Sequence, residues 1–507
     1  MKRNMNTTPI LTLGLICALT VTGIPALTSF AASIPEGSQL ESRQADGTNS
    51  APKVIYTQRP SDGVSQENPF LRGTGGSDSF RIPALITLDD GTMIAAADAR
   101  WNSNMDGGGF DTLVSRSADG GKTWSYTFAN YLGDNGNTYN GKESTCFIDP
   151  SLATDGRRVY MLCDLYPYGV ALNGDKDVTP STETGFNKEG KLLLEKDREN
   201  HGGVPVYDYY LDGDSIYTTE GVKVEGYRVD EHFNITGEGV DSNLFFKDSP
   251  YKVARTSFFY LVTSDDGGKT WNAPSLVNVK NTSERAYLVG PGRGVVTADG
   301  TIVFPCYTWN NTAQSQKTNF IYSKDGGNSW QRSTPMPSGD WSSESAVVEL
   351  KDGTLRFFYR NPNKKLYYID YQSNKWSAPV NTGLDTSSNT QISAIKYSRQ
   401  VNGQDVILVS CPTGPNRAGS DSSGLQGRVN GEIFVGLLNK EDNSIDWKKD
   451  KSIKVNDGGS LFLYSCLTEM KDGRIALLYE NDLQENDSHM GFTTMDFKTF
   501  SLDLNFN

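Results

Sequence analysis

An eight-residue phrase occurs three times in this chain and constrains its fold more than any other feature. The copies share the pattern Ser-x-Asp-Gly-Gly-x-Thr/Ser-Trp and occupy residues 117–124, 264–271 and 323–330. Each copy follows a short apolar run with β-branched residues, so we expect a strand to enter a tight turn built on Asp and Gly. The Trp that ends each copy can pack back beneath that turn. A repeated unit of strand and turn predicts a repeat architecture.

A second, weaker repeat consists of an Asp-Gly or Asn-Gly pair followed by a strand-like run. Its glycines are separated by 65, 144, 53, 50 and 70 residues and are Gly91, Gly156, Gly300, Gly353, Gly403 and Gly473. These dipeptides are strong hairpin signals. Six units of roughly 50–70 residues, with short strands and no convincing amphipathic helix, predict an all-β fold, namely a six-bladed β-propeller.

Both repeats contain one interval that is too long, and the surplus falls in the same place. The first two copies of the eight-residue phrase start at residues 117 and 264, and about 90 surplus residues lie between positions 165 and 255. This stretch is polar but has strand-like pieces, and its tyrosines and valines could build a small core. We therefore expect an inserted, mostly β subdomain over residues 165–255, with a disordered loop as the alternative.

The N-terminus is typical of a secretory signal peptide, expected over residues 1–32. Two basic residues precede an apolar stretch over residues 10–27, and small residues follow it. Thr, Gly and Pro interrupt that stretch, which disfavours a transmembrane anchor. Residues 33–53 are polar and read as a flexible leader, and residues 54–507 as the propeller domain. We expect a secreted, extracellular protein without a stable membrane anchor.

Charge and composition exclude several classes of function. The chain has 48 Lys and Arg against 61 Asp and Glu, a net charge of −13, which argues against a nucleic-acid partner. A small anionic substrate is still compatible, because it responds to local arginines. Three scattered histidines and cysteines without metal-ligand spacing predict neither a zinc site nor a disulfide framework. The cysteines are expected to be buried thiols, and no cofactor or metal is expected.

The run Phe80-Arg81-Ile82-Pro83, followed by the repeated Asp-Gly-Gly phrases, resembles the signature of the sialidases (neuraminidases). In that family the phrases are called Asp boxes and are structural. The resemblance is to the secreted bacterial members and covers residues from about 60 to 507. It implies an exo-acting glycosidase that removes terminal sialic acid. Its partners would be sialylated glycans, glycoproteins or glycolipids.

The resemblance implies three arginines that bind the carboxylate of sialic acid, a task that suits planar guanidinium groups. Arg81 lies in the Phe-Arg-Ile-Pro motif, and Arg360 ends the strand that follows Asp352-Gly353. Arg428, in Gly-Arg-Val-Asn-Gly, matches the third position better than Arg417, which is nearby and remains an alternative.

The expected nucleophile is a tyrosine. An anionic nucleophile would be repelled by the carboxylate on the anomeric carbon of sialic acid, whereas a neutral phenol that ionises only as it attacks is not. Sialidases use tyrosine in place of a carboxylate. Tyr464, in a Tyr-Ser motif before the last hairpin, matches that residue, and Glu344 matches the carboxylate that takes its proton. The chain has 24 tyrosines, so only the motif distinguishes Tyr464 from a core tyrosine.

The remaining expected site residues are carried over from the same resemblance. Asp106, on a glycine-rich loop, would be the general acid and base, although Asp-Gly is also an ordinary turn. Arg100 and Asp149 resemble residues that contact a ring hydroxyl and the N-acetyl region of the sugar. Glu480 resembles a carboxylate that orients Arg81.

The predicted function is hydrolysis of terminal α-linked sialic acid with retention, through a sialyl-tyrosine intermediate. One alternative is an intramolecular trans-sialidase that releases an anhydro sugar. In the family that outcome goes with a bulky aromatic side chain at the site, and residues 480–491 contain no Trp, which favours hydrolysis. A catalytically silent propeller that binds sialoglycans is the other alternative, since Asp boxes occur in many propellers. The retained acid and nucleophile argue against it.

Overall fold

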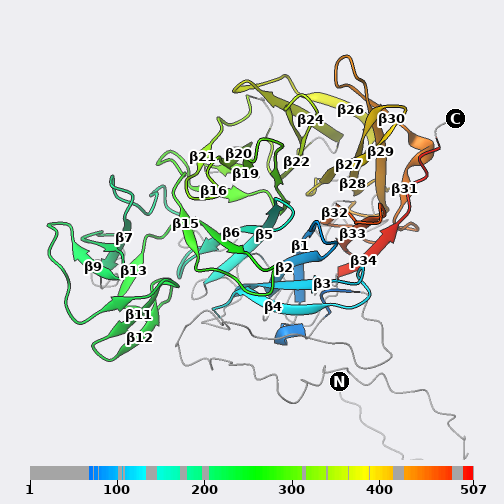
Figure 1. Ribbon diagram of the computed structural model, residues 1–507. Coiled ribbons are helices and arrows are strands. Elements are labelled where there is room, and N and C mark those ends of the chain that lie inside the picture. Colours follow the sequence, from blue (N-terminus) through cyan, green and yellow to red (C-terminus); the bar gives the residue numbers. More distant parts are fainter. Residues whose placement is uncertain are drawn as a thin grey trace, which may run out of the picture. The chain divides into compact units, whose positions relative to one another are not determined.

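The computed structural model describes fourteen segments of the chain, all within one compact unit over residues 34–507. They are residues 68–71, 74–77, 79–100, 106, 109–132, 145–171, 180–196, 205–310, 316–337, 341–362, 365–386, 389–414, 427–481 and 495–505. The expected signal peptide and leader lie outside them. Strands dominate the described residues (Figure 1), and helix is limited to short 3-10 turns such as η1 (Thr74–Gly76) and η6 (Lys449–Lys451). The all-β prediction is confirmed. In these segments no helix has the length and apolar character of a membrane span.

The first sheet has nine strands and is made of two antiparallel runs. The first run is β1-β2-β3-β4 and the second is β5-β6-β14-β15. They meet where β3 and β5 pair in parallel at Phe110 and Cys146, and β17 adds to β5 in parallel. The bounds are β1 (Ser79–Thr87), β2 (Met93–Arg100), β3 (Phe110–Ser117), β4 (Ser125–Asn130), β5 (Cys146–Thr154), β6 (Val159–Tyr166), β14 (Phe258–Ser264), β15 (Ser275–Val277) and β17 (Gly292–Arg293).

Further antiparallel sheets follow along the chain, each with its own run of strands. One contains β16 (Ala286–Val289), β18 (Val295–Val296), β19 (Ile302–Trp309), β20 (Lys317–Ser323) and β21 (Gln331–Arg332). The next contains β22 (Ser345–Glu349), β23 (Leu355–Tyr359), β24 (Lys365–Gln372), β25 (Lys375–Trp376) and β26 (Val380–Asp385). The next contains β27 (Ser393–Val401), β28 (Gln404–Pro412), β29 (Gly431–Leu438), β30 (Ile445–Trp447) and β31 (Ile453–Lys454), and the last contains β32 (Ser465–Glu469), β33 (Ile475–Glu480) and β34 (Met495–Phe500).

Two small sheets occupy the part of the chain between β6 and β14. One has the order β13-β7-β8-β9 and the other β10-β11-β12. Because β6 and β14 pair directly with each other, the chain leaves the large sheet after β6 and returns beside it. The bounds are β7 (Leu192–Lys196), β8 (Tyr209–Asp212), β9 (Ser215–Thr218), β10 (Arg228–Val229), β11 (Asn234–Gly237), β12 (Val240–Asn243) and β13 (Tyr251–Val253). The expected insertion at residues 165–255 falls on these strands.

The six Asp-Gly and Asn-Gly pairs of the weak repeat occupy the same kind of hairpin turn. Each joins a strand to its antiparallel partner, as between β1 and β2 or between β32 and β33. Their six glycines have φ values from 74° to 98°, the left-handed region that glycine adopts without steric cost. The hairpins predicted from the weak repeat are confirmed.

The eight-residue phrases form a second kind of turn, between the later strands of a run. In the first copy, one oxygen of Asp119 accepts bonds from the backbone N–H groups of Lys122 and Thr123 at 3.1 and 3.0 Å, and Ser117 Oγ donates to it at 2.9 Å. Trp124 lies edge-on to Phe497 of β34, 5.2 Å between ring centroids. This contact joins the first run to the last sheet, so the predicted structural role of the phrase is confirmed.

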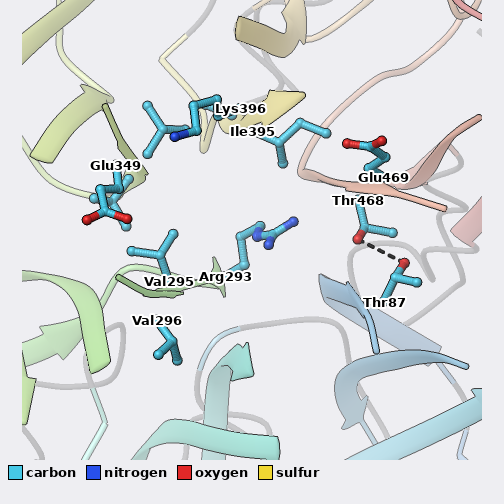
Figure 2. Close-up of a pocket in the computed structure, with 12 residues that line it drawn as sticks. Thr87, Arg293, Val295, Val296, Glu349, Ile395, Lys396, Thr468 and Glu469 are labelled. Atoms are coloured by element: carbon cyan, nitrogen blue, oxygen red, sulfur yellow. Dashed lines mark hydrogen bonds between the residues drawn. The ribbon is translucent and has the colours of Figure 1, made fainter. Parts of the chain in front are cut away.

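A cavity of about 260 Å³ lies at the end of three strands that each begin a run (Figure 2). Its lining includes the last residue of β1, Thr87, the last of β22, Glu349, and the last of β32, Glu469. The residues of the candidate site lie at the opposite ends of the same strands.

Candidate functional site

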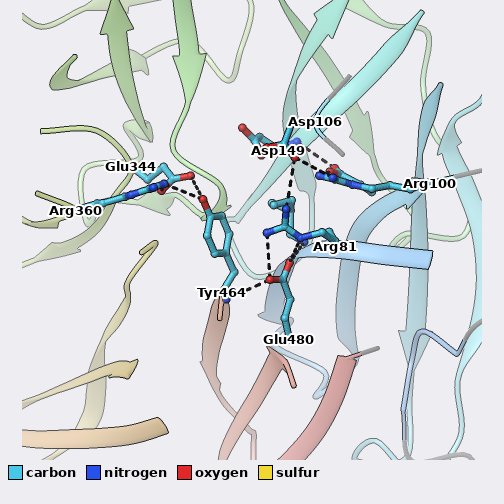
Figure 3. A network of polar contacts seen from close by, with 10 residues as sticks. Arg81, Arg100, Asp106, Asp149, Glu344, Arg360, Tyr464 and Glu480 are labelled. Carbon is cyan, nitrogen blue, oxygen red and sulfur yellow. Dashed lines mark hydrogen bonds and ion pairs between the residues drawn. The ribbon is translucent and has the colours of Figure 1, made fainter. Parts of the chain in front are cut away.

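The expected site residues occupy equivalent cross-strand pairs in different runs. Arg81 of β1 pairs with Asp98 of β2. The backbone N–H of Arg360, just after β23, donates to the carbonyl of Glu344, just before β22, at 2.9 Å. In the same way Glu480 N donates to the carbonyl of Tyr464 at 3.0 Å. A repeated backbone position therefore delivers different side chains to one place (Figure 3).

Tyr464, Glu344 and Arg360 form the centre of the site (Figure 3). The Tyr464 hydroxyl donates to Glu344 Oε1 at 2.5 Å, and Arg360 Nη1 donates to Glu344 Oε2 at 2.7 Å and to the Tyr464 hydroxyl at 3.0 Å. Burial, together with the Glu344 carboxylate, raises the pKa of Tyr464 above its ordinary value. The phenol is therefore neutral at rest, with the Glu344 side chain already in contact with its proton.

Three arginines surround the Tyr464 ring. Besides the contact from Arg360, the guanidinium carbons of Arg81 and Arg428 lie 5.4 and 5.7 Å from the ring centroid. Arg81 and Arg360 are each paired with a carboxylate. The three side chains come from separate sheets, and their convergence produces a concentrated positive charge suited to a carboxylate ligand.

Arg428 differs from the other two arginines in having no carboxylate partner among the described residues. Its Nη2 donates to the carbonyl of Asn389 at 2.8 Å, and its buried Nε has no hydrogen-bond partner there. Burial, and then the charge of Arg360, lower the pKa of Arg428 to about 10. Arg428 is still cationic at neutral pH, so its charge is available to an anionic ligand.

Asn389 is a residue that the sequence analysis missed. Its side-chain oxygen accepts a bond from Arg360 Nε, while its carbonyl binds Arg428, so it holds two of the three arginines. Its position in the repeat could have identified Asn389 as a site residue. It lies shortly before β27, the first strand of its sheet, just as Glu344 and Tyr464 lie before β22 and β32. No motif marked it. Arg417, the alternative to Arg428, lies outside the described residues.

Asp106 faces the arginines from the loop after β2. Its Oδ1 accepts a bond from Arg100 Nη1 at 2.8 Å and a longer one from Arg81 Nη1 at 3.5 Å, and 37% of its side chain is exposed. Burial alone would raise the pKa of Asp106, but the charges of Arg100 and Arg81 outweigh it and hold the pKa below the ordinary value. Arg100 itself has no exposed surface.

Two backbone irregularities place the remaining residues. Ile82 in β1 and Asp149 in β5 have φ values of 64° and 63°, each next to a break in the strand register and before a proline. Left-handed backbone is strained in residues other than glycine, most of all in β-branched ones. Glu480 supports the first irregularity, since it accepts the N–H of Ile82 at 2.8 Å and two bonds from Arg81.

The structure therefore brings all nine expected site residues into one region, where Tyr464 contacts Glu344, Arg360, Arg81 and Arg428. Within the described segments no group of three or more His, Cys, Asp or Glu side chains could hold a metal ion. The five cysteines in those segments are free and buried, as predicted. The roles of the site residues remain predictions.

Comparison with known proteins identifies relatives of this chain. A family model described as a BNR repeat-like domain matches residues 82–433. The chain is 29% identical over 486 residues to an anhydrosialidase of Macrobdella decora, covering 84% of the chain and 61% of that protein. It is 30% identical over 495 residues to sialidase B of Streptococcus pneumoniae, covering 86% of the chain and 67% of that protein. The chain thus spans less than two thirds of the first relative's length.

A solved structure shows a similar fold. The intramolecular trans-sialidase from Ruminococcus gnavus, in complex with oseltamivir carboxylate, superposes with a TM-score of 0.72 at 28% identity, over 85% of this chain and 96% of that one. The sialidase structures to which the chain is similar are β-propellers, which agrees with the repeated antiparallel runs. The repeat, the site geometry and these matches together show that the chain belongs to the sialidase family.

Proposed function

We propose that this protein is an exo-α-sialidase that hydrolyses terminal sialic acid from sialylated glycans with retention of configuration. The observation that carries the proposal is the contact of the buried Tyr464 hydroxyl with Glu344 at 2.5 Å beneath three converging arginines. A neutral nucleophile, a base in contact with it and a carboxylate-binding cluster are the parts that this reaction requires.

The arginines would bind the carboxylate of sialic acid. Arg360 and Arg81 are held by Glu344 and Glu480, so their orientation is set before the ligand arrives, which lowers the entropic cost of binding. Arg428 adds a positive charge that has no carboxylate partner within the described segments. With the carboxylate held there, the anomeric carbon that bears it would lie over the Tyr464 hydroxyl.

In the first half of the reaction, the Tyr464 oxygen would attack the anomeric carbon while its proton passes to Glu344 Oε1. Asp106 would donate a proton to the glycosidic oxygen as the bond from the anomeric carbon to that oxygen breaks. The products of this step are a free alcohol, a sialyl-Tyr464 intermediate, a protonated Glu344 and an ionised Asp106.

In the second half, Asp106 would take a proton from water as the water oxygen attacks the anomeric carbon. The bond to the Tyr464 oxygen breaks, and Glu344 returns its proton to the phenol. Two inversions give net retention. Both carboxylates and the tyrosine end in their starting states.

Substrate binding would also prepare Asp106 for its role as an acid. The low pKa of Asp106 in the unliganded protein is maintained by Arg100 and Arg81. A substrate carboxylate at Arg81 would neutralise part of that charge and raise the pKa of Asp106, since removing a nearby cation disfavours the ionised form. The acid would then be protonated where the leaving oxygen needs it.

We extend the proposal to the architecture and the location. Each antiparallel run would be one blade of a six-bladed propeller, with residues 165–255 as a subdomain inserted between β6 and β14. The sequence features of residues 1–32 favour secretion by a cleaved signal peptide.

A second candidate is an intramolecular trans-sialidase, in which a hydroxyl of the sugar replaces water in the second half. The names of two similar proteins, an anhydrosialidase and an intramolecular trans-sialidase, favour it. The absence of Trp from residues 480–491 favours hydrolysis; residues 482–491 of that segment lie outside the described residues.

Turnover of a fluorogenic α-sialoside by the full chain, with the product identified by NMR, tests the proposal. We expect release of free sialic acid, first as the α anomer. An anhydro sugar as the product would favour the second candidate instead. Binding of the sialoside without turnover would indicate a catalytically silent, sialoglycan-binding propeller and would overturn both enzymatic proposals.

A further inference from the structure

Buried carboxylates on the second strands of three runs share an unusual contact. Each accepts a backbone N–H from the first strand of another run, and each carboxylate has no exposed surface. The bonds run from Ile82 N to Glu480 at 2.8 Å, from Asp149 N to Asp98 at 3.1 Å, and from Val289 N to Asp164 at 3.2 and 3.3 Å. The contact therefore recurs with the repeat and ties neighbouring runs together.

Two of these carboxylates also bind an arginine that reaches the candidate site. Glu480 binds Arg81 through both of its oxygens. Asp98 Oδ2 accepts a bond from Arg100 Nη2 at 2.7 Å. Asp164 has no arginine or lysine within ion-pair distance among the described residues. Asp98 thus has the same double contact as Glu480, which the family resemblance marks as orienting Arg81, whereas Asp164 has only the backbone contact.

We propose that Asp98 is a positioning residue for the reaction, because its two oxygens hold the Arg100 guanidinium against Asp106 and the left-handed backbone at Asp149 at the same time. This inference rests on the proposed function for the role of Asp106. The inference adds Asp98 to the residues of the site, although Asp98 belongs to no family motif and does not contact the substrate.

The Arg100 side chain gives this arrangement its rigidity. One terminal nitrogen contacts Asp98 at 2.7 Å and the other contacts Asp106 at 2.8 Å. The guanidinium carbon also lies 4.4 Å from the ring centroid of Phe110. When a buried carboxylate fixes one edge of a planar guanidinium group, the orientation of its other edge is fixed as well. The position of Asp98 therefore determines where Arg100 holds Asp106.

The charges around Asp98 define how the contact depends on pH. Burial raises the pKa of Asp98 to about 7, although Arg100 and Arg81 lower it and Asp106 raises it. From β5 and β6, the groups facing this region are the carboxyls of Asp149 and Asp164, whose pKa values burial raises, and the buried thiols of Cys146 and Cys163. The pKa values of these thiols are also raised by burial, so they are neutral at pH 7.

The sign of the effect on Asp106 follows from these charges. Above about pH 7 Asp98 is ionised, and its negative charge offsets Arg100 and favours the protonated form of Asp106. Below that pH Asp98 is neutral, so the positive charge of Arg100 is not offset and favours the ionised form of Asp106. Asp98 therefore helps Asp106 to retain its proton on the alkaline side of neutrality.

Asp98→Asn is the test, with Asp164→Asn as its matched control. The asparagine keeps the size and an acceptor for Asp149 N but cannot become negative. We expect its kcat at pH 5.5 to stay within a few-fold of the wild type and its kcat at pH 8 to fall about tenfold, a shift of the alkaline limb by about one unit. Asp164→Asn removes an equally buried carboxylate without an arginine and should leave the shape of the profile unchanged. Circular dichroism at both pH values should show the same folded fraction, so that the ratio of the kcat values reports catalysis alone.

A second measurement does not depend on turnover. The Asp106 carboxyl signal, followed by carbon NMR in protein labelled at aspartate and assigned from Asp106→Asn, should show a second step in chemical shift near pH 7 in the wild type, where Asp98 ionises. This step should be absent in Asp98→Asn, and in Asp98→Ser, a smaller variant that retains a hydroxyl acceptor and replaces Asp98→Asn if that variant does not fold. A wild-type signal without the step, or its loss in Asp164→Asn as well, would overturn the inference. A wild type without turnover but with the expected NMR shifts would overturn the proposed function and leave the positioning role supported.

Discussion

The first strands of the runs have polar side chains at both ends, and the two ends differ in the partners to which these side chains bond. At the starts of β1 and β32, or just before them, Arg81 and Tyr464 contact carboxylates from other sheets, and Glu344, just before β22, bonds both to Tyr464 and to Arg360 of its own hairpin. At the ends of the same strands, Glu349 accepts the N–H of Ala298 at 2.9 Å, and Glu469 accepts bonds from the backbone and hydroxyl of Ser398. The difference lies in how the charges are satisfied.

Polar groups at the far end bond to neutral partners on neighbouring sheets, whereas those at the site end join several charged groups in one network. Figure 2 shows Thr87 and Thr468 in contact beside the cavity, 3.1 Å between their hydroxyl oxygens. Arg293 there donates to the carbonyl of Leu467 at 3.0 Å rather than to a carboxylate among the described residues. Such bonds to neutral groups stabilise the fold, while the network of opposite and like charges at the other end is typical of a functional site.

The largest effect is expected for Tyr464→Phe, which removes only the nucleophilic oxygen. Turnover of a fluorogenic sialoside should fall by at least about a thousandfold, because no other group can form the covalent intermediate. Circular dichroism and the thermal unfolding midpoint should show that the fold persists. At the far end of the same strand, Thr468→Val removes one hydroxyl and should keep wild-type kcat. Wild-type turnover in Tyr464→Phe would show that the nucleophile is another residue.

An intermediate effect is expected for Arg360→Lys, compared with Arg293→Lys. The ammonium group keeps the charge but cannot contact Glu344, Tyr464 and a substrate carboxylate together. We expect KM to rise about tenfold to a hundredfold, or about 1.4–2.8 kcal/mol, with the fold intact. Arg293→Lys should leave KM unchanged, because that side chain lines the opposite cavity. Equal effects of the two variants would mean that the contrast between the strand ends has no functional meaning.

The smallest effect is expected for the Asp boxes, represented by Asp266→Ala. Burial raises the pKa of Asp266, but hydrogen bonds from Thr270 and its neighbours outweigh it and hold the pKa below the ordinary value. The ionised form therefore contributes stability above about pH 4, which is lost as the pH falls through the lower folded-state pKa. We expect a loss of about 1 kcal/mol in urea unfolding at pH 7, a smaller loss at pH 3, and unchanged KM. A change in KM without a change in stability would assign the box to the site instead.

The sequence repeats predicted the hairpins well, because their turns depend on local chemistry. Gly91 and Gly473 lie in turns that require positive φ, and the Asp119 and Asp266 boxes are held by bonds within a few residues. Such interactions are encoded in adjacent residues, so spacing alone reveals them.

The site was predicted only where a motif happened to surround a residue. Arg81 and Tyr464 carry such motifs. Asn389 and Asp98 do not, because their partners come from other runs: Asn389 holds Arg360 and Arg428, and Asp98 reaches Asp149 of β5. Contacts between runs depend on register and twist, which no short stretch of sequence specifies.

The sequence by itself determined the strand-and-turn repeat, the all-β class and the identity of the side chains that meet Tyr464. The tertiary structure decided which of them touch and in what charge state, including the neutral phenol of Tyr464 and the Arg428 side chain, whose Nε has no hydrogen-bond partner among the described residues. The physical reason is range: a turn is formed by neighbours in the chain, whereas a pKa is set by burial and by charges that only folding brings together.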